Sequence, residues 1–175
     1  MHRLVQLALA LLLVALFCAP ASAYEDELTL DASVGYSGLP GSDDLPEHGA
    51  YVGLSAGWGI NDAWGIQGNL AFSRHPDASP LNIGLLGLET TYLLDIVRFV
   101  PVVGAGIDGL MTVRERHVQG DFALHALVGV DFLINPDWLV GVDSRLYWIP
   151  AELSSDLEPF MFTVAVHAGY RFDLF

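Results

Sequence analysis

Residues 28–37 read LTLDASVGYS, and apolar side chains alternate there with small or polar ones over all ten positions. The apolar positions are Leu28, Leu30, Ala32, Val34 and Tyr36. Successive side chains of a β-strand point to opposite faces of its sheet, so an alternation of period two predicts a strand with one apolar and one polar face.

Seven later segments repeat this alternation. They span residues 51–60, 64–73, 86–94, 103–108, 122–132, 140–148 and 162–172. The chain is therefore predicted to be all-β, with eight strands of roughly ten residues, which is the length that a tilted strand needs to cross a bilayer. No segment after Ala23 approaches the about 20 consecutive apolar residues of a membrane-spanning helix.

The composition excludes several classes of protein. The 175 residues are 53% hydrophobic and carry a formal net charge of −14, with seven arginines, no lysine and one cysteine. Such a hydrophobic chain is not disordered, and one cysteine cannot build a disulfide scaffold. A strongly acidic chain is also not a basic nucleic-acid binder. The length is that of one domain.

The first 23 residues predict a secretory signal peptide. Arg3 precedes the apolar run LVQLALALLLVALFCA, and Ala21-Ser22-Ala23 forms a small-residue cleavage site. A retained membrane anchor is the alternative, but the run is short for a span. We therefore expect a signal peptide at residues 1–23 and a mature barrel domain at 24–175. Cys18 lies in the removed segment, so the mature chain would have no cysteine.

The connections predict how the strands are arranged. Long polar stretches, GLPGSDDLPEHG (38–49), RHPDASP (74–80), TVRERHVQGD (112–121) and PAELSSDLEP (150–159), alternate with short turns at 61–62, 95–97 and 135–137. This alternation is typical of an antiparallel up-and-down transmembrane barrel, with short periplasmic turns and longer outer loops.

Aromatic residues gather at both ends of the predicted strands, as they do where a membrane barrel meets the two interfaces. Those beside the short turns are Trp58, Trp64, Tyr92, Phe99, Phe132, Trp138, Tyr170 and Phe172. Those beside the long connections are Tyr36, Tyr51, Phe72, Phe122, Trp148, Phe160 and Phe162. Two aromatic girdles are therefore predicted.

The signal peptide, the eight alternating segments, the glycine-rich stretch VVGAGIDG (102–109) and the ending AGYRFDLF (168–175) resemble the small eight-stranded outer-membrane β-barrel proteins related to the OmpA membrane domain. The resemblance covers the whole mature chain and implies a protein of the Gram-negative cell envelope. In that family the last strand ends in an aromatic residue, and the barrel-assembly machinery reads such an ending as a signal. The last strand of this chain resembles that signal. Phe172 has the outward register and Phe175 the opposite one, so both are candidates for that residue.

The polar face of the strands is expected to fill the barrel interior. It comprises Asp31, Gln67, Asn69, Glu89, Asp108, His125, Asp131, Asp143, Arg145, Tyr147, His167 and Arg171. An eight-stranded barrel is just wide enough for its own side chains, so these residues predict a packed polar plug. Five acids face two arginines in this set, so an acid is protonated, a histidine is charged or water enters. An alternative is a metal or acid/base cluster of His125, His167, Asp131 and Asp143. We expect no catalytic residue, cofactor or metal.

The loops offer further candidates. The acids Asp43, Asp44, Glu47, Glu152, Asp156 and Glu158 are expected to be solvated. Arg74, Arg114 and Arg116 could bind lipopolysaccharide phosphates, because guanidinium binds phosphate with two nitrogens. His117 and Ser154-Ser155 would suit a lipid-modifying site.

The predicted function is a non-catalytic structural or surface-interaction barrel of the bacterial outer membrane. Its expected partners are membrane lipid, lipopolysaccharide and the assembly machinery, and its oligomeric state is open. Three alternatives remain from the sequence: a lipid A-modifying barrel enzyme, a small ion-conducting barrel, and a soluble lipocalin-like binder with the apolar face inside.

Overall fold

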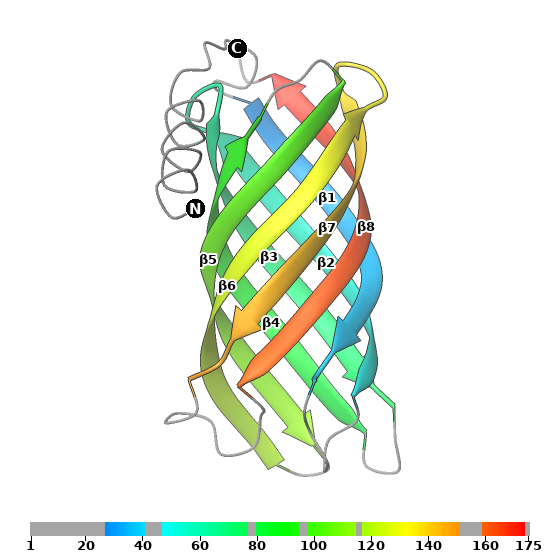
Figure 1. The fold of residues 1–175 in the computed structure, drawn as a ribbon, viewed down its shortest axis with the longest axis vertical. Helices are drawn as coiled ribbons and strands as arrows, with labels where there is room; N and C mark the ends of the chain where they lie inside the picture. The colour runs from blue at the N-terminus through cyan, green and yellow to red at the C-terminus, as the bar shows by residue number, and fades with distance from the viewer. Residues whose placement is uncertain are drawn as a thin grey trace, which may run out of the picture.

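The chain forms one closed barrel of eight antiparallel strands (Figure 1). The computed structural model describes residues 27–40, 47–76, 80–94, 98–114, 117–150 and 159–173. The strands are β1 (Glu27–Gly38), β2 (His48–Gly59), β3 (Trp64–His75), β4 (Leu81–Leu93), β5 (Phe99–Arg114), β6 (His117–Leu133), β7 (Trp138–Trp148) and β8 (Phe160–Asp173). Each strand pairs with the next one along the chain, and β8 closes the barrel on β1.

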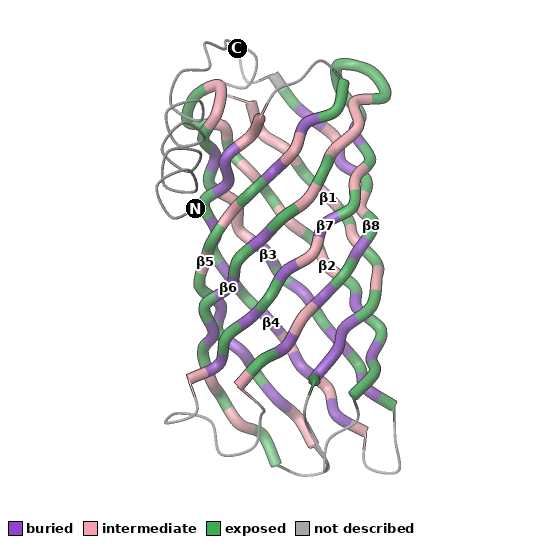
Figure 2. The backbone as a smooth tube through the Cα atoms, in the orientation of Figure 1, coloured by how far each residue is buried: buried purple, intermediate pink, exposed green. Residues whose placement is uncertain are grey.

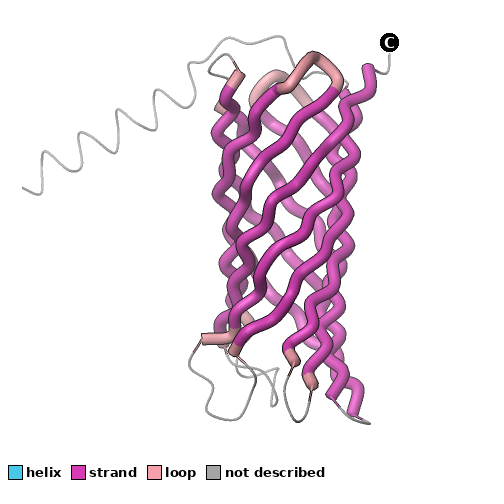
Figure 3. The backbone as a smooth tube through the Cα atoms, turned by 90° about the vertical axis from the view of Figure 1, so that its right-hand side faces the viewer, coloured by secondary structure: helices cyan, strands magenta, loops and turns pink. Residues whose placement is uncertain are grey.

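The strand ends at which β2 leads to β3, β4 to β5 and β6 to β7 lie at one end of the barrel, which we call the turn end; the opposite end is the loop end (Figure 3). Two of these turns contain the same hydrogen-bonding pattern. The Oδ1 of Asn61 accepts hydrogen bonds from the backbone N–H groups of Ala63 and Trp64. The Oδ1 of Asn135 does the same for Asp137 and Trp138. An asparagine that binds its own backbone in this way favours a tight turn between two strands.

The outer face of the barrel is apolar and the inner face carries the charges. Exposed and buried positions alternate along the strands (Figure 2). Leu54 and Leu86 on the outside are 61% and 68% exposed, whereas Glu89 is 2% exposed on the inside. A soluble calyx needs the opposite polarity. The lipocalin-like alternative is therefore wrong.

The strands are longer than the predicted ten residues, and one predicted loop is largely strand. β5 has 16 residues and β6 has 17, and only residues 115–116 separate them. Arg114 pairs with His117, so most of the stretch predicted as a long loop at 112–121 continues the hairpin. β3 likewise extends to His75. The strict alternation of long and short connections is thus wrong, because polar residues also occupy strand ends beyond the apolar belt.

The inside of the barrel holds an apolar cluster that the sequence analysis did not predict. Its residues are Leu39, Tyr51, Ala71, Leu81, Ile83, Leu85, Leu110, Ala123, Tyr147, Ile149, Met161 and Ala165. Most of them belong to the loop half of their strands, so we call this cluster the apolar plug. The apolar plug therefore lies towards the loop end, where buried polar residues such as Ser37, Ser73 and His75 accompany it.

Several predictions lie outside the described residues. These are the signal peptide at 1–23, the loop residues Asp43, Asp44, Arg116, Glu152, Ser154, Ser155, Asp156 and Glu158, and the terminal Phe175. Glu47 and His117 are described and exposed. The described residues contain no helix long and apolar enough to span a membrane.

Candidate functional site

The polar part of the lumen contains a continuous chain of alternating acids and bases. It begins at Asp108 on β5, whose carboxylate contacts Nδ1 of His125 on β6. The Nε2 of His125 lies 2.7 Å from Oε2 of Glu89 on β4. Arg145 on β7 then donates to both carboxylate oxygens of Glu89, from Nη2 at 2.9 Å and from Nε at 3.3 Å. The bidentate geometry makes Glu89–Arg145 the centre of the chain.

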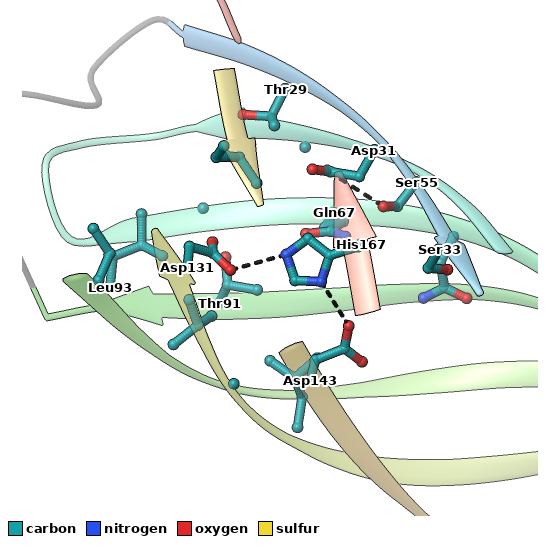
Figure 4. Close-up of a pocket in the computed structure, with 18 of the residues that line it drawn as sticks. Thr29, Asp31, Ser33, Ser55, Gln67, Thr91, Leu93, Asp131, Asp143 and His167 are labelled. Carbon is teal, nitrogen blue, oxygen red and sulfur yellow. Dashed lines mark hydrogen bonds and ion pairs between the residues drawn. The ribbon is translucent and has the colours of Figure 1, made fainter. Parts of the chain in front are cut away.

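The chain continues to the far wall of the barrel. Nη1 of Arg145 donates to Asp143 at 2.5 Å, and Asp143 also contacts Nδ1 of His167 on β8 at 3.0 Å. The Nε2 of His167 lies 2.9 Å from Asp131 on β6 (Figure 4). The chain of seven residues, Asp108, His125, Glu89, Arg145, Asp143, His167 and Asp131, is called the ionic network below. It joins the five strands from β4 to β8 across the lumen.

The electrostatics of the ionic network are nearly balanced. Both ring nitrogens of His125 and of His167 face carboxylate oxygens. An imidazole donates from both nitrogens only as the imidazolium, so two charged histidines and Arg145 face four carboxylates and leave one negative charge. Burying unpaired charges would cost several kcal/mol each, and this pairing offsets that cost.

A cavity of about 120 Å³ with a mixed polar and apolar lining lies between the ionic network and the turn end. Asp31, Gln67 and Thr91 line it together with His167 and Asp131 (Figure 4). Asp31 accepts a hydrogen bond from Ser55 at 3.4 Å, and no described basic side chain forms an ion pair with it. A cavity of this size is suited to hold several water molecules next to its polar side chains.

Arg171 lies at the turn end of this cavity. Its guanidinium pairs with the carboxylate of Glu27, at the start of β1. The sequence analysis placed Arg171 inside but missed Glu27, although Glu27 has the same odd-numbered register on its strand as Asp31. This pair bridges the first and last strands where the barrel closes.

Glycines on neighbouring strands make room for the ionic network. The register pairs Gly87 with Asp108, Gly106 with both Glu89 and His125, and Gly141 with both Asp131 and His167. A Cβ at Gly106 would lie 2.6 Å from Cε1 of His125, which is too close for any real contact. In so narrow a barrel, large inner side chains need small residues opposite them.

A histidine with two serines lies near the loop end, and the sequence analysis did not single it out. The Nε2 of His75 is 3.2 Å from Ser37 Oγ and 3.3 Å from Ser73 Oγ. All three residues are fully buried, with 0% exposure. The arrangement holds strand ends together and is closed to a substrate.

The three arginines proposed for phosphate binding do not share one surface. Arg74 is exposed and has the outer register of β3. Arg114 has the inner register of β5 and is half-buried, and Arg116 lies outside the described residues. The parity of the two strands thus separates Arg74 from Arg114, and binding of lipopolysaccharide phosphates by these arginines stays a prediction.

The aromatic residues at the turn end form cross-strand pairs on the outer face. Trp64 packs against Tyr92, with ring centroids 4.9 Å apart, and Phe99 packs against Phe132 at 5.0 Å. Trp138 packs against Tyr170 at 5.1 Å, and Tyr170 packs against Phe172 at 4.6 Å. The remaining aromatic residue of the girdle at the turn end, Trp58, is exposed on β2.

At the loop end, the outer face carries Tyr36, Phe72, Phe122, Trp148, Phe160 and Phe162. Tyr51 does not belong to this girdle, contrary to the prediction. It has the inner register of β2, is 3% exposed and joins the apolar plug. The alternation that points Val52 outward requires its neighbour Tyr51 to point inward.

The lumen offers little for catalysis or metal binding. The ring nitrogens of His125 and His167 already bind carboxylates, so neither histidine has a nitrogen left for a substrate or metal. Across the described ranges, no group of three or more His, Cys, Asp and Glu residues could hold a metal ion. The arrangement braces the barrel.

Comparisons with known proteins agree with this architecture. Residues 9–172 match the family model of the outer membrane protein beta-barrel domain. The solved structure of Neisserial surface protein A, NspA, superposes with a TM-score of 0.66 at 16% identity, over 89% of this chain and 100% of that one. The N-terminal barrel of Pseudomonas aeruginosa OprF superposes with a TM-score of 0.58 at 15% identity, over 85% of this chain and 98% of that one. The attachment invasion locus protein Ail of Yersinia pestis superposes with a TM-score of 0.55 at 18% identity, over 85% of this chain and 99% of that one. No curated protein sequence matches the chain.

Proposed function

Because the chain belongs to the outer membrane protein beta-barrel domain family, we propose that it is a non-catalytic barrel embedded in the bacterial outer membrane, with a structural or surface-interaction role. Export would depend on the signal peptide predicted at residues 1–23. The turn end would face the periplasm and the loop end the cell surface.

The apolar outer face is the observation that carries this proposal. Large hydrophobic side chains cover the outside of every strand, while the ion pairs lie inside. Each exposed leucine or valine left in water forgoes roughly 1.5–3 kcal/mol of burial free energy. A closed barrel with this polarity is stable only in a hydrocarbon surrounding, where the aromatic rings at both ends suit the two interfaces.

The filled lumen supports a structural role over ion conduction. The apolar plug occupies the loop half of the interior, and the ionic network crosses the middle. Side chains such as Leu81, Ile83 and Met161 are fully buried there and narrow the interior, so they oppose the passage of an ion. The cavity at the turn end would then be a closed-ended vestibule.

The proposed partners follow from this location. Outer-membrane lipid would surround the apolar belt, and lipopolysaccharide would meet the loop end. The barrel-assembly machinery would insert the chain, guided by its aromatic ending. No arrangement in the described residues favours lipid A modification, since the serines next to His75 are buried.

The test is expression in a Gram-negative host, followed by separation of the two membranes by density. We expect the protein in the outer membrane, with faster gel migration unheated than boiled. Lipid A acylation should stay unchanged by mass spectrometry, and planar bilayers should show no conductance steps. Recovery of the processed chain as a detergent-free monomer in periplasmic extract would refute the proposal.

A further inference from the structure

An exposed cation occupies the outer face of the barrel at the loop end. Arg74, the second-last residue of β3, points to the outside and lies opposite Ala50 on β2 and Asn82 on β4. Within the described ranges, no acidic side chain forms an ion pair with it. Arg74 is also the only arginine with the outer register at this end among the described residues. Arg74 is thus an exposed positive charge on a chain with net charge −14.

A second nitrogen donor lies on the same surface. His48 is two residues from Ala50 on β2, so it has the same outward register and is the diagonal neighbour of Arg74. The Tyr36 hydroxyl is 2.5 Å from Nδ1 of His48, and the ring of Tyr36 packs against Phe162. When Tyr36 donates to Nδ1, the ring proton of His48 is on Nε2 and is available to an external acceptor.

An apolar hollow crosses the outer face from β1 to β6 and includes the part of β3 around Gly68. It has a volume of about 950 Å³ and is lined by Leu54, Gly68, Leu70, Leu88 and Ile107, among others. Gly68 creates depth there, because the nearest side-chain atom to a Cβ at this position is Leu88 Cδ2 at 3.8 Å. The flanking leucines are among the most exposed apolar residues of the barrel.

The separation of the cation and the hollow matches one leaflet of a bilayer. Gly68 precedes Arg74 by six residues on β3. Six residues at about 3.4 Å each span about 20 Å along the strand, and a strand tilt of about 40° reduces this to about 15 Å of depth. The hydrocarbon core is about 30 Å thick, so one leaflet is about 15 Å. A lipid with its phosphate at Arg74 would reach the hollow with the end of an acyl chain.

We propose that the outer face of β2 and β3 is a binding site for a phosphorylated lipid of the outer leaflet, with Arg74 and His48 holding the phosphate and the hollow around Gly68 holding an acyl chain. The inference rests on the proposed membrane location and goes beyond it by naming the site and the chemistry. The guanidinium suits a phosphate because it can donate two parallel hydrogen bonds.

The test is a lipid titration of the full barrel folded in detergent micelles, read by native mass spectrometry. The probes are bis-phosphorylated lipid A, the same lipid without phosphates, and inorganic phosphate. We expect the phosphorylated lipid to bind at least about 10-fold more tightly than its dephosphorylated form. A difference of this size corresponds to the contribution of one charge-assisted hydrogen bond. Arg74→Gln should remove that preference, and His48→Gln should reduce it.

The second arm tests the acyl-chain part of the site. Gly68→Leu occupies the part of the hollow on β3 without touching the cations, so it should weaken lipid binding. The matched controls are Arg98→Gln, an exposed arginine near the turn end, and Gly120→Leu, an outer glycine of β6 whose Cβ would have no neighbour within 4 Å. Both should bind lipid like the wild type.

Three results would overturn the site: equal binding of both lipid forms, an Arg74→Gln barrel that keeps the preference, or competition by inorganic phosphate at the same concentration as the lipid. The last would mean that the site recognises a free anion. Heat-modifiable migration of each variant shows whether the barrel is folded. A wild-type barrel that reaches the outer membrane without lipid preference refutes only this inference, whereas a barrel absent from that membrane refutes the proposed function.

Discussion

The guanidinium of Arg145 on β7 binds both carboxylate oxygens of Glu89 on β4, across the barrel lumen. The two residues are 56 positions apart in the chain. Glu89 also accepts from His125, and Arg145 also donates to Asp143, so the pair connects the two halves of the ionic network. Both side chains are almost fully enclosed.

Replacement of Arg145 should strongly destabilise the barrel. Arg145→Gln would leave Glu89 and Asp143 without their shared cation, and removal of one partner from a buried ion pair costs about 3–5 kcal/mol. Urea unfolding from lipid vesicles measures this loss. Arg98→Gln, at an exposed position near the turn end, should change the free energy of unfolding by no more than about 0.5 kcal/mol. Similar stabilities for the two variants would contradict a bracing role of the network.

A methyl group at Gly106 should also disrupt the interior. In Gly106→Ala the new Cβ would collide with the His125 ring and with the backbone carbonyl of Leu88. Overpacking of this kind costs about 1–3 kcal/mol. In Gly109→Ala, three residues along β5, the Cβ points outward and lies 3.8 Å from the nearest atom, the Leu86 carbonyl oxygen. The same unfolding assay should show a loss for Gly106→Ala alone; equal effects would mean that the glycine is not needed for space.

Thiol labelling should reveal the division of the lumen. Cys18 is the only cysteine of the chain and lies in the predicted signal peptide, so single-cysteine variants are simple to make. Ser55→Cys would place a thiol in the cavity at the turn end, whereas Thr163→Cys would place one at a position with 0% exposure. A small charged methanethiosulfonate reagent should modify the first thiol in the folded barrel and spare the second. Rapid modification of both would show that water passes the apolar plug.

The last strand yields a prediction about assembly. Phe172 lies on the outer face of β8 and belongs to the aromatic group with Tyr170 and Trp138. If the assembly machinery reads an outward aromatic residue, Phe172→Ala should lower the heat-modifiable fraction in the outer membrane more than Phe175→Ala. The comparison is made at equal expression. The reverse order would assign the signal to Phe175.

The sequence was sufficient for the strand count and for the direction of most side chains. The alternation from Phe162 to Phe172 survives in β8, with His167 and Arg171 inside. The sequence was insufficient in strands whose inward and outward positions are both apolar. In β4, Leu81, Ile83 and Leu85 point inward while Leu86 and Leu88 point outward, so composition does not distinguish the two faces.

Strand ends were the least predictable part of the fold. The stretch at 112–121 is polar enough for a loop, yet most of it is paired strand because the β5–β6 hairpin continues beyond its neighbour β7. Paired strands can contain polar residues, so hydropathy alone does not predict where the pairing of two strands ends. The strands of Arg74 and Arg114 likewise present opposite parities to the outside, so only Arg74 has the outer register.

The amino-acid order alone determined that this chain has eight two-sided strands, because the direction of a side chain in a strand depends only on local backbone geometry. The tertiary structure decided which inner groups meet. Closure of a barrel staggers each strand against the next, and that stagger, absent from the alternation itself, brings Glu89 to Arg145 and places His125 between Asp108 and Glu89.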